Sequence, residues 1–425
     1  MANYGSLLIN GRLIRSIREH EYLDWFFHLI FHATDVIIYE EISGEIKEEK
    51  HVLSAPSFVI MDRMSILGYT ESQMREDFAA FRQEKIDDLT FHIEEDFTID
   101  VDSYARERRF WKRYQLDDFI KRVAKLVHNP GWKIRSVPFE KIYSNIDNYI
   151  MDEPFDLLDR LPFNSELSAL RAFLMVVDPE TPLIFDYTEL YDCGAVTDED
   201  VVSYNSDKPK IIILTEGSSD IAVLKSALNL LFPHLEEIYS FFDFESFNAQ
   251  GGSGSLVNMV KSFAGAGITN NVIALFDNDT AAREAQMSLK DLTLPKRIKL
   301  VNCPHVTFAE HYPTLGPTGL NYMDINGLAC SIELYLGEDV LKDEKGDFLP
   351  ILWKGYSPKI QAYQGEIMCK KDIQGRFFQK LSASREDTTF LNTADWRGLI
   401  AIFEMIFDSF NDGKNHYRSI LTPIS

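Results

Sequence analysis

The pattern of apolar and polar residues between positions 209 and 304 predicts a parallel sheet flanked by helices. Four apolar runs, each typical of a strand buried on both faces, alternate with three segments in which apolar residues recur at helical spacing. The runs are "PKIIILTEG", "IYSFFDF", "NNVIALFDND" and "RIKLVNCP", and the helical segments are "SDIAVLKSALNLLF", the later part of "GGSGSLVNMVKSFAGAG" and "TAAREAQMSLKDL". This alternation is typical of an α/β fold, whose functional groups gather at the C-terminal ends of the strands.

The chain before this region shows mostly helical periodicity, after short strand-like segments within residues 1–60. Met74, Phe78 and Phe81 predict a helix that begins near Thr70. Further helices are expected over 103–129, 139–151 and 165–177. We therefore predict a mainly helical, α+β N-terminal domain with a small sheet near its start.

Changes in composition along the chain suggest the domain boundaries. Residues 186–208 are acidic and poor in large aliphatic side chains, which is typical of a linker. The predicted organisation is an N-terminal domain at 1–185, an acidic linker at 186–208, an α/β core at 209–340 and a C-terminal extension at 341–425 that completes the core.

Composition indicates a globular protein of the reducing cytoplasm. The 425 residues are 45% hydrophobic, and no apolar run approaches the roughly 20 residues of a membrane span. The N-terminal segment lacks a basic region followed by a long apolar stretch, so no signal peptide and no membrane association are expected. The four cysteines lie far apart without a CxxC pair, which argues against a zinc ribbon or a disulfide framework.

The formal net charge of −23 argues against nucleic-acid binding through bulk electrostatics. The acidic excess is uneven, because residues 341–425 hold 12 Lys and Arg against 11 Asp and Glu, a net +1. Carboxylates that bind a metal ion also count as negative in this sum. The charge therefore weakens a nucleic-acid hypothesis without excluding it.

Acidic residues follow two of the predicted strands. Glu216 ends the first strand, with Asp220 four residues later, and Asp277 and Asp279 end the third strand. Residues i and i+2 share a face in extended structure, so both aspartates would point to one spot. Such an oxygen cluster suits Mg²⁺ or Mn²⁺ and phosphoryl chemistry. The alternative is structural: Asp220 or its neighbouring serines cap a helix, and "DND" forms a turn with an Asx cap.

"IIILTEGSSD", followed some sixty residues later by "VIALFDNDTAA", resembles the TOPRIM domain of topoisomerases, bacterial primases and overcoming-lysogenization-defect (OLD) nucleases. The resemblance covers about 210–340 and implies a TOPRIM-like sheet with a divalent metal held by Glu216, Asp277 and Asp279. It further implies that Asp220 helps to hold a second metal. The segment "YGSLLINGRLIRSI" resembles, less specifically, the N-terminal region of HEPN/TOPRIM-associated proteins, which are suspected of defence against phage.

Glu333, in "SIELYLG", matches an acid that nuclease-type TOPRIM proteins use at the second metal. Asp324 is a weaker alternative ligand, and the structural alternative for Glu333 is a solvent-facing helix glutamate. OLD-like nucleases also use a lysine after the acidic motifs to stabilise the transition-state phosphate, and Lys370 or Lys371 would serve. Both lysines begin a predicted helix, where the helix dipole disfavours positive charge, and this placement suggests that they serve to bind an anion. The alternative is that they are two ordinary surface lysines.

The sequence favours the nuclease branch over the other TOPRIM branches. No recognisable DNA-gate domain of a topoisomerase occurs, and neither does the cysteine-rich zinc module of a bacterial primase. The glycine-rich segment "NAQGGSGSLVNMVK" would cradle phosphate or simply connect strand and helix, but it is not a Walker A motif, so we expect no ATPase in this chain. Arg122 and His128 fit the loose R-x4–6-H pattern of HEPN ribonucleases, which recurs by chance.

These patterns together predict a cytoplasmic, metal-dependent TOPRIM endonuclease that hydrolyses DNA, with a role in anti-phage defence. Glu216, Asp277, Asp279 and Lys370 or Lys371 would be catalytic, with Mg²⁺ or Mn²⁺ as cofactor. The alternatives are an RNA- or tRNA-cleaving toxin and a non-catalytic scaffold in a defence complex. Expected partners are nucleic acid, a separately encoded ATPase or sensor, and further copies of the chain.

Overall fold

The computed structural model describes residues 4–18, 27–43, 46–95, 100–129, 138–150, 157–201, 209–242, 250–411 and 415–421. The chain divides into two compact units, Met1–Lys208 and Pro209–Ser425. Each unit has its own hydrophobic core and its own sheet, and each is described separately below. Within the described residues, no helix has the length and apolar character needed to cross a membrane.

The N-terminal unit contains a five-stranded sheet in the order β2-β1-β5-β4-β3, with every described pairing antiparallel. Its strands are β1 (Tyr4–Ile9), β2 (Arg12–Arg18), β3 (Val36–Ser43), β4 (Ile46–Pro56) and β5 (Pro182–Asp186). β5 joins this sheet from more than a hundred residues further along the chain, a pairing that local periodicity did not predict.

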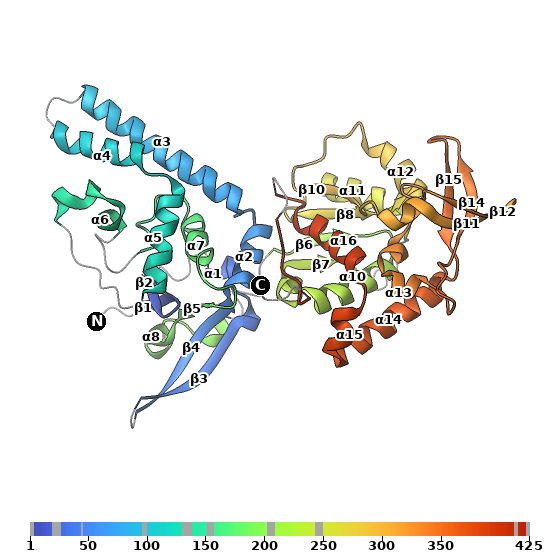
Figure 1. The fold of residues 1–425 in the computed structure, drawn as a ribbon, viewed down its shortest axis with the longest axis horizontal. Coiled ribbons are helices and arrows are strands. Elements are labelled where there is room, and N and C mark those ends of the chain that lie inside the picture. The colour runs from blue at the N-terminus through green and yellow to red at the C-terminus, as the bar shows by residue number, and fades with distance from the viewer. Residues whose placement is uncertain are drawn as a thin grey trace. The chain divides into compact units, whose positions relative to one another are not determined.

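Helices bury the core of this unit, which agrees with the predicted α+β arrangement (Figure 1). They are α1 (Phe27–Ile30), α2 (Ser57–Ile66), α3 (Glu71–Glu95), α4 (Val101–Arg113), α5 (Leu116–His128), α6 (Ile146–Ile150), α7 (Glu166–Leu174) and α8 (Thr188–Asp192), with 3-10 turns at Ala33–Asp35 and Phe139–Ser144. The helix predicted near Thr70 is α3, and the Thr70 hydroxyl accepts a hydrogen bond from the Gln73 N–H at 3.2 Å.

Two sequence predictions for this unit need correction, and one helix was missed. The single helix expected over 103–129 is two helices, because the Asp118 carboxylate accepts a hydrogen bond from the Gln115 N–H and begins α5 afresh. Helix α2 was not predicted, since burial on several sides removes the amphipathic signal. Part of the expected acidic linker is folded, because Tyr187 and Leu190 are buried in the core of this unit.

The C-terminal unit contains the predicted parallel sheet, in the order β10-β8-β6-β7. Its strands are β6 (Ile211–Leu214), β7 (Tyr239–Phe241), β8 (Val272–Phe276) and β10 (Ile298–Asn302), alternating with helices α10 (Ser218–Leu231), α11 (Ser253–Ala266) and α12 (Thr280–Gln286). In Figure 1 the strands lie between α11 and α10. The α/β fold class is therefore confirmed, strand by strand, in this region.

The rest of this unit adds a second sheet and a helical layer. The second sheet has the order β12-β11-β14-β15, with β11 (Tyr312–Gly316), β12 (Gly319–Met323), β14 (Ile351–Ser357) and β15 (Ala362–Ile367). A short antiparallel pair joins β9 (Asn278–Asp279) to β13 (Ala329–Cys330). The helices are α13 (Glu338–Leu341), α14 (Lys370–Glu386), α15 (Thr388–Thr393) and α16 (Arg397–Phe407), with 3-10 turns at Pro233–Ile238, Met287–Leu289, Thr307–His311 and Ile332–Tyr335. Helix α10 packs against α14 and α16.

Candidate active site

Glu216 and Asp277 meet where β6 and β8 end. The two strands are hydrogen-bonded neighbours, so their C-terminal ends lie side by side. The Asp277 backbone N–H donates to Glu216 Oε1 at 3.1 Å, and the Ser253 hydroxyl donates to Glu216 Oε2 at 2.6 Å. The structure thus brings together two of the residues that the sequence singled out, and it holds the Glu216 carboxylate in place with two donors.

The glycine-rich segment packs directly on the Glu216 turn. The Gly252 N–H donates to the Glu216 carbonyl oxygen at 2.6 Å, and a Cβ at Gly251 would lie 2.8 Å from that same oxygen. Only glycine allows this approach at position 251. The segment therefore positions Glu216 and delivers Ser253 to it. Sequence reasoning did not assign Ser253, although its place in a Gly-Ser turn before a helix was the available signal.

Asp279 and Asp220 both cap helices, as the structural alternatives proposed. Asp279 is the N-cap of α12: Oδ1 accepts from the Ala282 N–H and Oδ2 from the Gln364 side-chain amide, each at 2.8 Å. Asp220 lies in the first turn of α10, and Oδ2 accepts from the Gly217 N–H at 2.9 Å. These bonds do not exhaust the lone pairs of either carboxylate, so a capping role and a ligand role are compatible.

Asp277 differs from the other acids because its carboxylate accepts no hydrogen bond from any residue in the described part of the chain. Its side chain is partly accessible at the end of β8. Burial and the charges of Glu216, Asp220, Asp279 and Glu333 raise the pKa of Asp277 well above its usual value. Asp277 thus combines a raised pKa with a carboxylate that no described donor contacts, so a bound cation would stabilise its charged form.

The pKa values of its neighbours move in the same direction. Burial, with contributions from Asp279 and Asp220, raises the pKa of Glu216 to about 7, against the hydrogen bonds from Ser253 and Asp277. Burial and the charge of Glu333 raise the pKa of Asp220 to about 6. Burial and the neighbouring negative charges together favour the protonated forms, and a bound cation would offset both effects.

Glu333 is fully buried, so the solvent-facing alternative for this residue is wrong. It lies in a 3-10 turn, where the Ser331 hydroxyl donates to Oε2 at 2.6 Å and the Gln374 amide donates to Oε1 at 2.8 Å. The Lys370 ammonium lies 3.1 Å from Oε1. The weaker alternative ligand, Asp324, is exposed and uses Oδ1 to accept hydrogen bonds from Asn326.

Lys370 and Lys371 occupy different environments at the start of α14. Burial lowers the pKa of Lys370, but Glu333, Asp277 and Asp220 outweigh it, and the net pKa is raised. Lys371 is exposed and pairs with no acid among the described residues. Both lysines line a cavity of about 510 Å³ together with Ser219 of α10 and Glu366 of β15. None of the five acids lines this cavity, but Lys370 and Gln374, which do, both contact Glu333, and Asp372 adds a second carboxylate to the lining.

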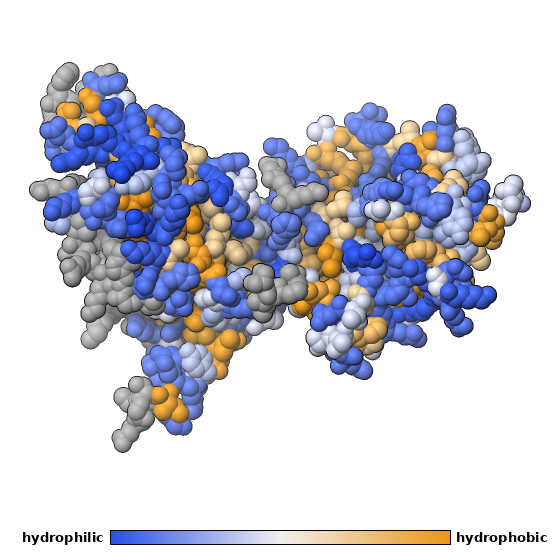
Figure 2. Space-filling model, in the orientation of Figure 1, coloured by the Kyte–Doolittle hydropathy of each residue, from blue (hydrophilic) through white to orange (hydrophobic). Residues whose placement is uncertain are grey.

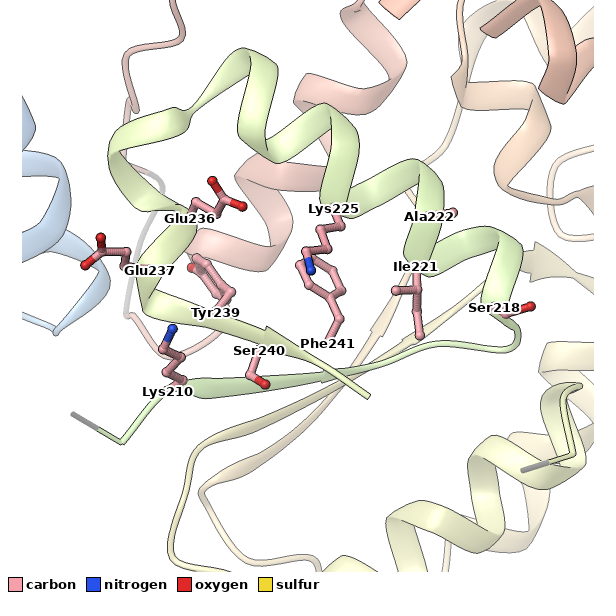
Figure 3. Close-up of a pocket in the computed structure, with 10 residues that line it drawn as sticks. All are labelled: Lys210, Ser218, Ile221, Ala222, Lys225, Glu236, Glu237, Tyr239, Ser240 and Phe241. Atoms are coloured by element: carbon pink, nitrogen blue, oxygen red, sulfur yellow. The ribbon is translucent and has the colours of Figure 1, made fainter. Parts of the chain in front are cut away.

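The same region contains two features that do not belong to this site. A cavity of about 550 Å³ lies between α10 and the edge strand β7, lined by Lys210, Lys225 and Glu236 among others, and it includes none of the five acids (Figure 3). The Arg376 guanidinium on α14 donates to the Lys342 carbonyl oxygen at 2.6 Å.

The R-x4–6-H pair of the N-terminal unit also has structural partners. Arg122 pairs with Asp147 at 3.3 Å, and the His128 ring contacts the Val176 carbonyl oxygen at 2.8 Å.

The five carboxylates fit a hard divalent cation by donor type. As the side chains stand, no three His, Cys, Asp or Glu groups within the described ranges converge closely enough to hold a metal ion. Glu216, Asp279 and Asp220 each accept hydrogen bonds from internal donors, which hold these carboxylates in their present positions.

Comparisons with known proteins bear on the N-terminal unit. Residues 1–208 match the family model described as HEPN/Toprim N-terminal domain 1, which supports a HEPN/TOPRIM-associated protein. Neither the comparison with curated proteins nor that with solved structures finds a match. The domain match suggests a nuclease-type or related role.

Proposed function

We propose that the C-terminal unit is a divalent-metal-dependent nuclease that hydrolyses DNA phosphodiesters, with a role in anti-phage defence. One observation carries the proposal: acids from two adjacent parallel strands, Glu216 and Asp277, meet at the strand ends with their pKa values raised. Such an arrangement of carboxylates is typical of phosphoryl-transfer sites. The match of residues 1–208 to a domain named for its association with Toprim supports the same role.

Mg²⁺ or Mn²⁺ is the cofactor that these oxygen donors suit. Glu216, Asp277 and Asp279 would hold one ion, and Asp220 and Glu333 would help to hold a second. When bound, the metal activates water and neutralises charge on the phosphate.

The chain's own groups would supply positioning and charge. Ser253 and the Asp277 N–H orient the Glu216 carboxylate. Lys370, held at Glu333, keeps its proton and would stabilise charge that develops on the phosphate, with Lys371 at the entrance of the same cavity.

A cleavage assay on the full chain tests this proposal. Plasmid DNA, linear DNA and tRNA are incubated with Mg²⁺, Mn²⁺ or EDTA, and Mn²⁺ binding is measured by calorimetry. We expect divalent-dependent DNA cleavage that falls by about 100-fold or more in Asp277→Asn and Glu216→Gln. Glu344→Gln, which changes an exposed glutamate of the same unit, is the matched control and should leave cleavage unchanged.

The lack of a preformed three-ligand cluster in the described residues favours a second candidate, a non-catalytic scaffold. No divalent-dependent cleavage of any substrate, together with no Mn²⁺ binding, would select that candidate. Cleavage of tRNA with DNA left intact would identify RNA as the substrate.

A further inference from the structure

A cluster of exposed aromatic side chains lies on the β14–β15 hairpin of the C-terminal unit. Tyr356 and Tyr363 face each other across the two strands, with ring centroids 5.0 Å apart, and Trp353 lies 6.0 Å from Tyr363. Tyr356 is 51% exposed and Tyr363 is 56% exposed. Figure 1 shows β14 and β15 side by side at one end of the unit. The two tyrosine rings are therefore open to solvent beside the half-buried Trp353, with neighbouring ring planes inclined at 65° and 58°.

This aromatic platform (Trp353, Tyr356 and Tyr363) is joined directly to the candidate active site. The Thr280 hydroxyl donates to the Tyr363 carbonyl at 2.7 Å, and the Ala281 N–H donates to Gln364 Oε1 at 2.8 Å. The other end of the Gln364 amide donates to Asp279. The Tyr363 backbone and the Gln364 side chain thus hold β15 against Asp279 and the start of α12. Because adjacent strand residues point to opposite faces, the Tyr363 ring lies on the face of β15 opposite the Gln364 side chain.

The cavity beside Lys370 continues to the same hairpin, because Glu366 of β15 lines it together with both lysines. Residues 351–371 carry four lysines against one glutamate. Three of these lysines pair with glutamates: Lys354 with Glu366, Lys359 with Glu284 and Lys370 with Glu333. A bulge between Trp353 and Gly355 interrupts the β14–β15 register in this segment, and such bulges re-aim neighbouring side chains. Exposed rings and the exposed Lys371, which pairs with no acid among the described residues, therefore occupy one stretch of the sequence.

We infer that the platform stacks unpaired bases of a nucleic-acid strand whose backbone enters the lysine-lined cavity. The inference rests on the proposed nuclease function and narrows its substrate to nucleic acid with single-stranded or splayed bases. Every base has a flat π face, so stacking tolerates any sequence, whereas a duplex keeps those faces covered. A chain with a net charge of −23 also needs a contribution such as base stacking, because its net charge does not attract a nucleic-acid strand.

The test is binding, measured without cleavage. Fluorescence anisotropy in EDTA follows labelled oligonucleotides of about 12 nucleotides, as single-stranded DNA, single-stranded RNA and duplex DNA, on the full-length protein. We expect both single strands to bind more tightly than the duplex. Tyr356→Ala/Tyr363→Ala should weaken single-strand binding by about tenfold or more, and Tyr356→Phe/Tyr363→Phe should stay within about threefold of the wild type.

Tyr322→Ala is the matched control, because Tyr322 is 51% exposed on β12 at the opposite edge of the same sheet. Thermal unfolding of each variant separates loss of binding from loss of fold. Equal binding of duplex and single strand, an unchanged affinity in the double alanine variant, or an equal loss in Tyr322→Ala would each overturn the inference. So would an altered oligomeric state in the double alanine variant with oligonucleotide binding intact, because the surface would then be a protein contact.

These outcomes are distinct from failure of the nuclease proposal. Cleavage of duplex DNA that is unaffected by the tyrosine substitutions would overturn the stacking inference alone. Tyrosine-dependent binding by a protein that never cleaves would overturn the nuclease proposal alone.

Discussion

At the scale of single residues, the acids at the ends of β6 and β8 set the properties of the candidate active site. Burial, reinforced by the charges of neighbouring carboxylates, raises the pKa of Glu216, Asp220 and Asp277 and makes their protonation favourable in the folded chain. A carboxyl whose pKa is raised by folding lowers stability as pH rises above its unfolded-state pKa, because the unfolded chain then releases a proton that the folded chain keeps; the loss is complete above the raised pKa.

Stability of the metal-free protein should therefore depend on pH through Glu216. Between its ordinary pKa of 4.5 and the raised value of about 7, the folded chain retains a proton that the unfolded chain has released, so stability falls as pH rises through this window. At about pH 8 in EDTA, Glu216→Gln should be more stable than the wild type by on the order of 1–3 kcal/mol, with little difference near pH 4.5. Urea unfolding at both pH values measures this.

Glutamine at this position can still accept from the Asp277 N–H and donate to the Ser253 oxygen, so the gain should not be masked by a lost contact. Glu344→Gln is the control and should show no pH-dependent gain. A Glu216→Gln variant that is less stable than the wild type at both pH values would contradict the raised pKa.

The sequence predicted the position of the acids better than their surroundings. Glu216 and Asp277 were predicted to converge because strand ends in a parallel sheet lie side by side. The donors to Asp279 and Glu333, Gln364 and Gln374, come from β15 and α14, whose packing no local pattern reveals. The choice between Lys370 and Lys371 was also open, since adjacent helical residues point about 100° apart and the helix orientation was unknown.

At the scale of elements, the four strands and three helices of the parallel sheet were all predicted, because buried runs and helical spacing differ clearly there. The second sheet was not predicted. Its strands carry mixed apolar and polar side chains without a regular alternation. The turn that leads into α13 follows the same region of the chain. Lys380 of α14 is buried at that turn, where its ammonium donates to the Leu336 and Asp395 carbonyls and pairs with Asp339.

Gly337, at this turn, should not tolerate a side chain. Its φ of +109° is a conformation that favours glycine, and a Cβ would lie 2.3 Å from the Asp395 carbonyl and 2.6 Å from the Lys380 ammonium. Gly337→Ala should lower the free energy of unfolding by at least about 2 kcal/mol. Chemical denaturation of the purified variant measures the change.

Gly375→Ala is the matched control, since Gly375 lies inside α14 with nothing within 4 Å of an added Cβ. Alanine there should raise the free energy of unfolding by about 0.5–1 kcal/mol. Equal destabilisation by the two substitutions would show that the turn at Gly337 imposes no special constraint.

At the scale of the whole molecule, the chain consists of two units with separate cores. In the view of Figure 2, hydrophilic residues cover much of the surface of each unit, and apolar residues appear in separate patches. The sequence placed the α/β region beyond residue 208, but it did not predict that β5 and α8 complete the N-terminal unit, because those contacts span most of its length.

The C-terminal unit should fold without the N-terminal one. Residues 209–425, expressed alone, should unfold in one cooperative transition with mixed α/β circular dichroism, because the core and both of its main sheets lie within these residues. Any divalent-dependent cleavage by the full chain should persist in this fragment. The fragment 1–208 is the control and should fold but not cleave, and cleavage by that fragment would place the chemistry in the N-terminal unit.

The pairing of Lys370 with the fully buried Glu333 has a consequence for how variants are interpreted. Removing the Lys370 ammonium alone would leave the buried Glu333 carboxylate without its counter-ion. The free energy of unfolding would fall by about 3–5 kcal/mol, and the loss of fold would abolish activity even if Lys370 had no part in catalysis. An inactive Lys370→Ala enzyme would thus be ambiguous, whereas Lys370→Met combined with Glu333→Gln neutralises both partners. Glu333→Gln alone is the reference, because Glu333 is itself a proposed ligand of the second metal. A further loss of turnover in the folded double variant would show that the lysine serves the phosphate, and equal turnover in the two variants would show that it serves only the glutamate.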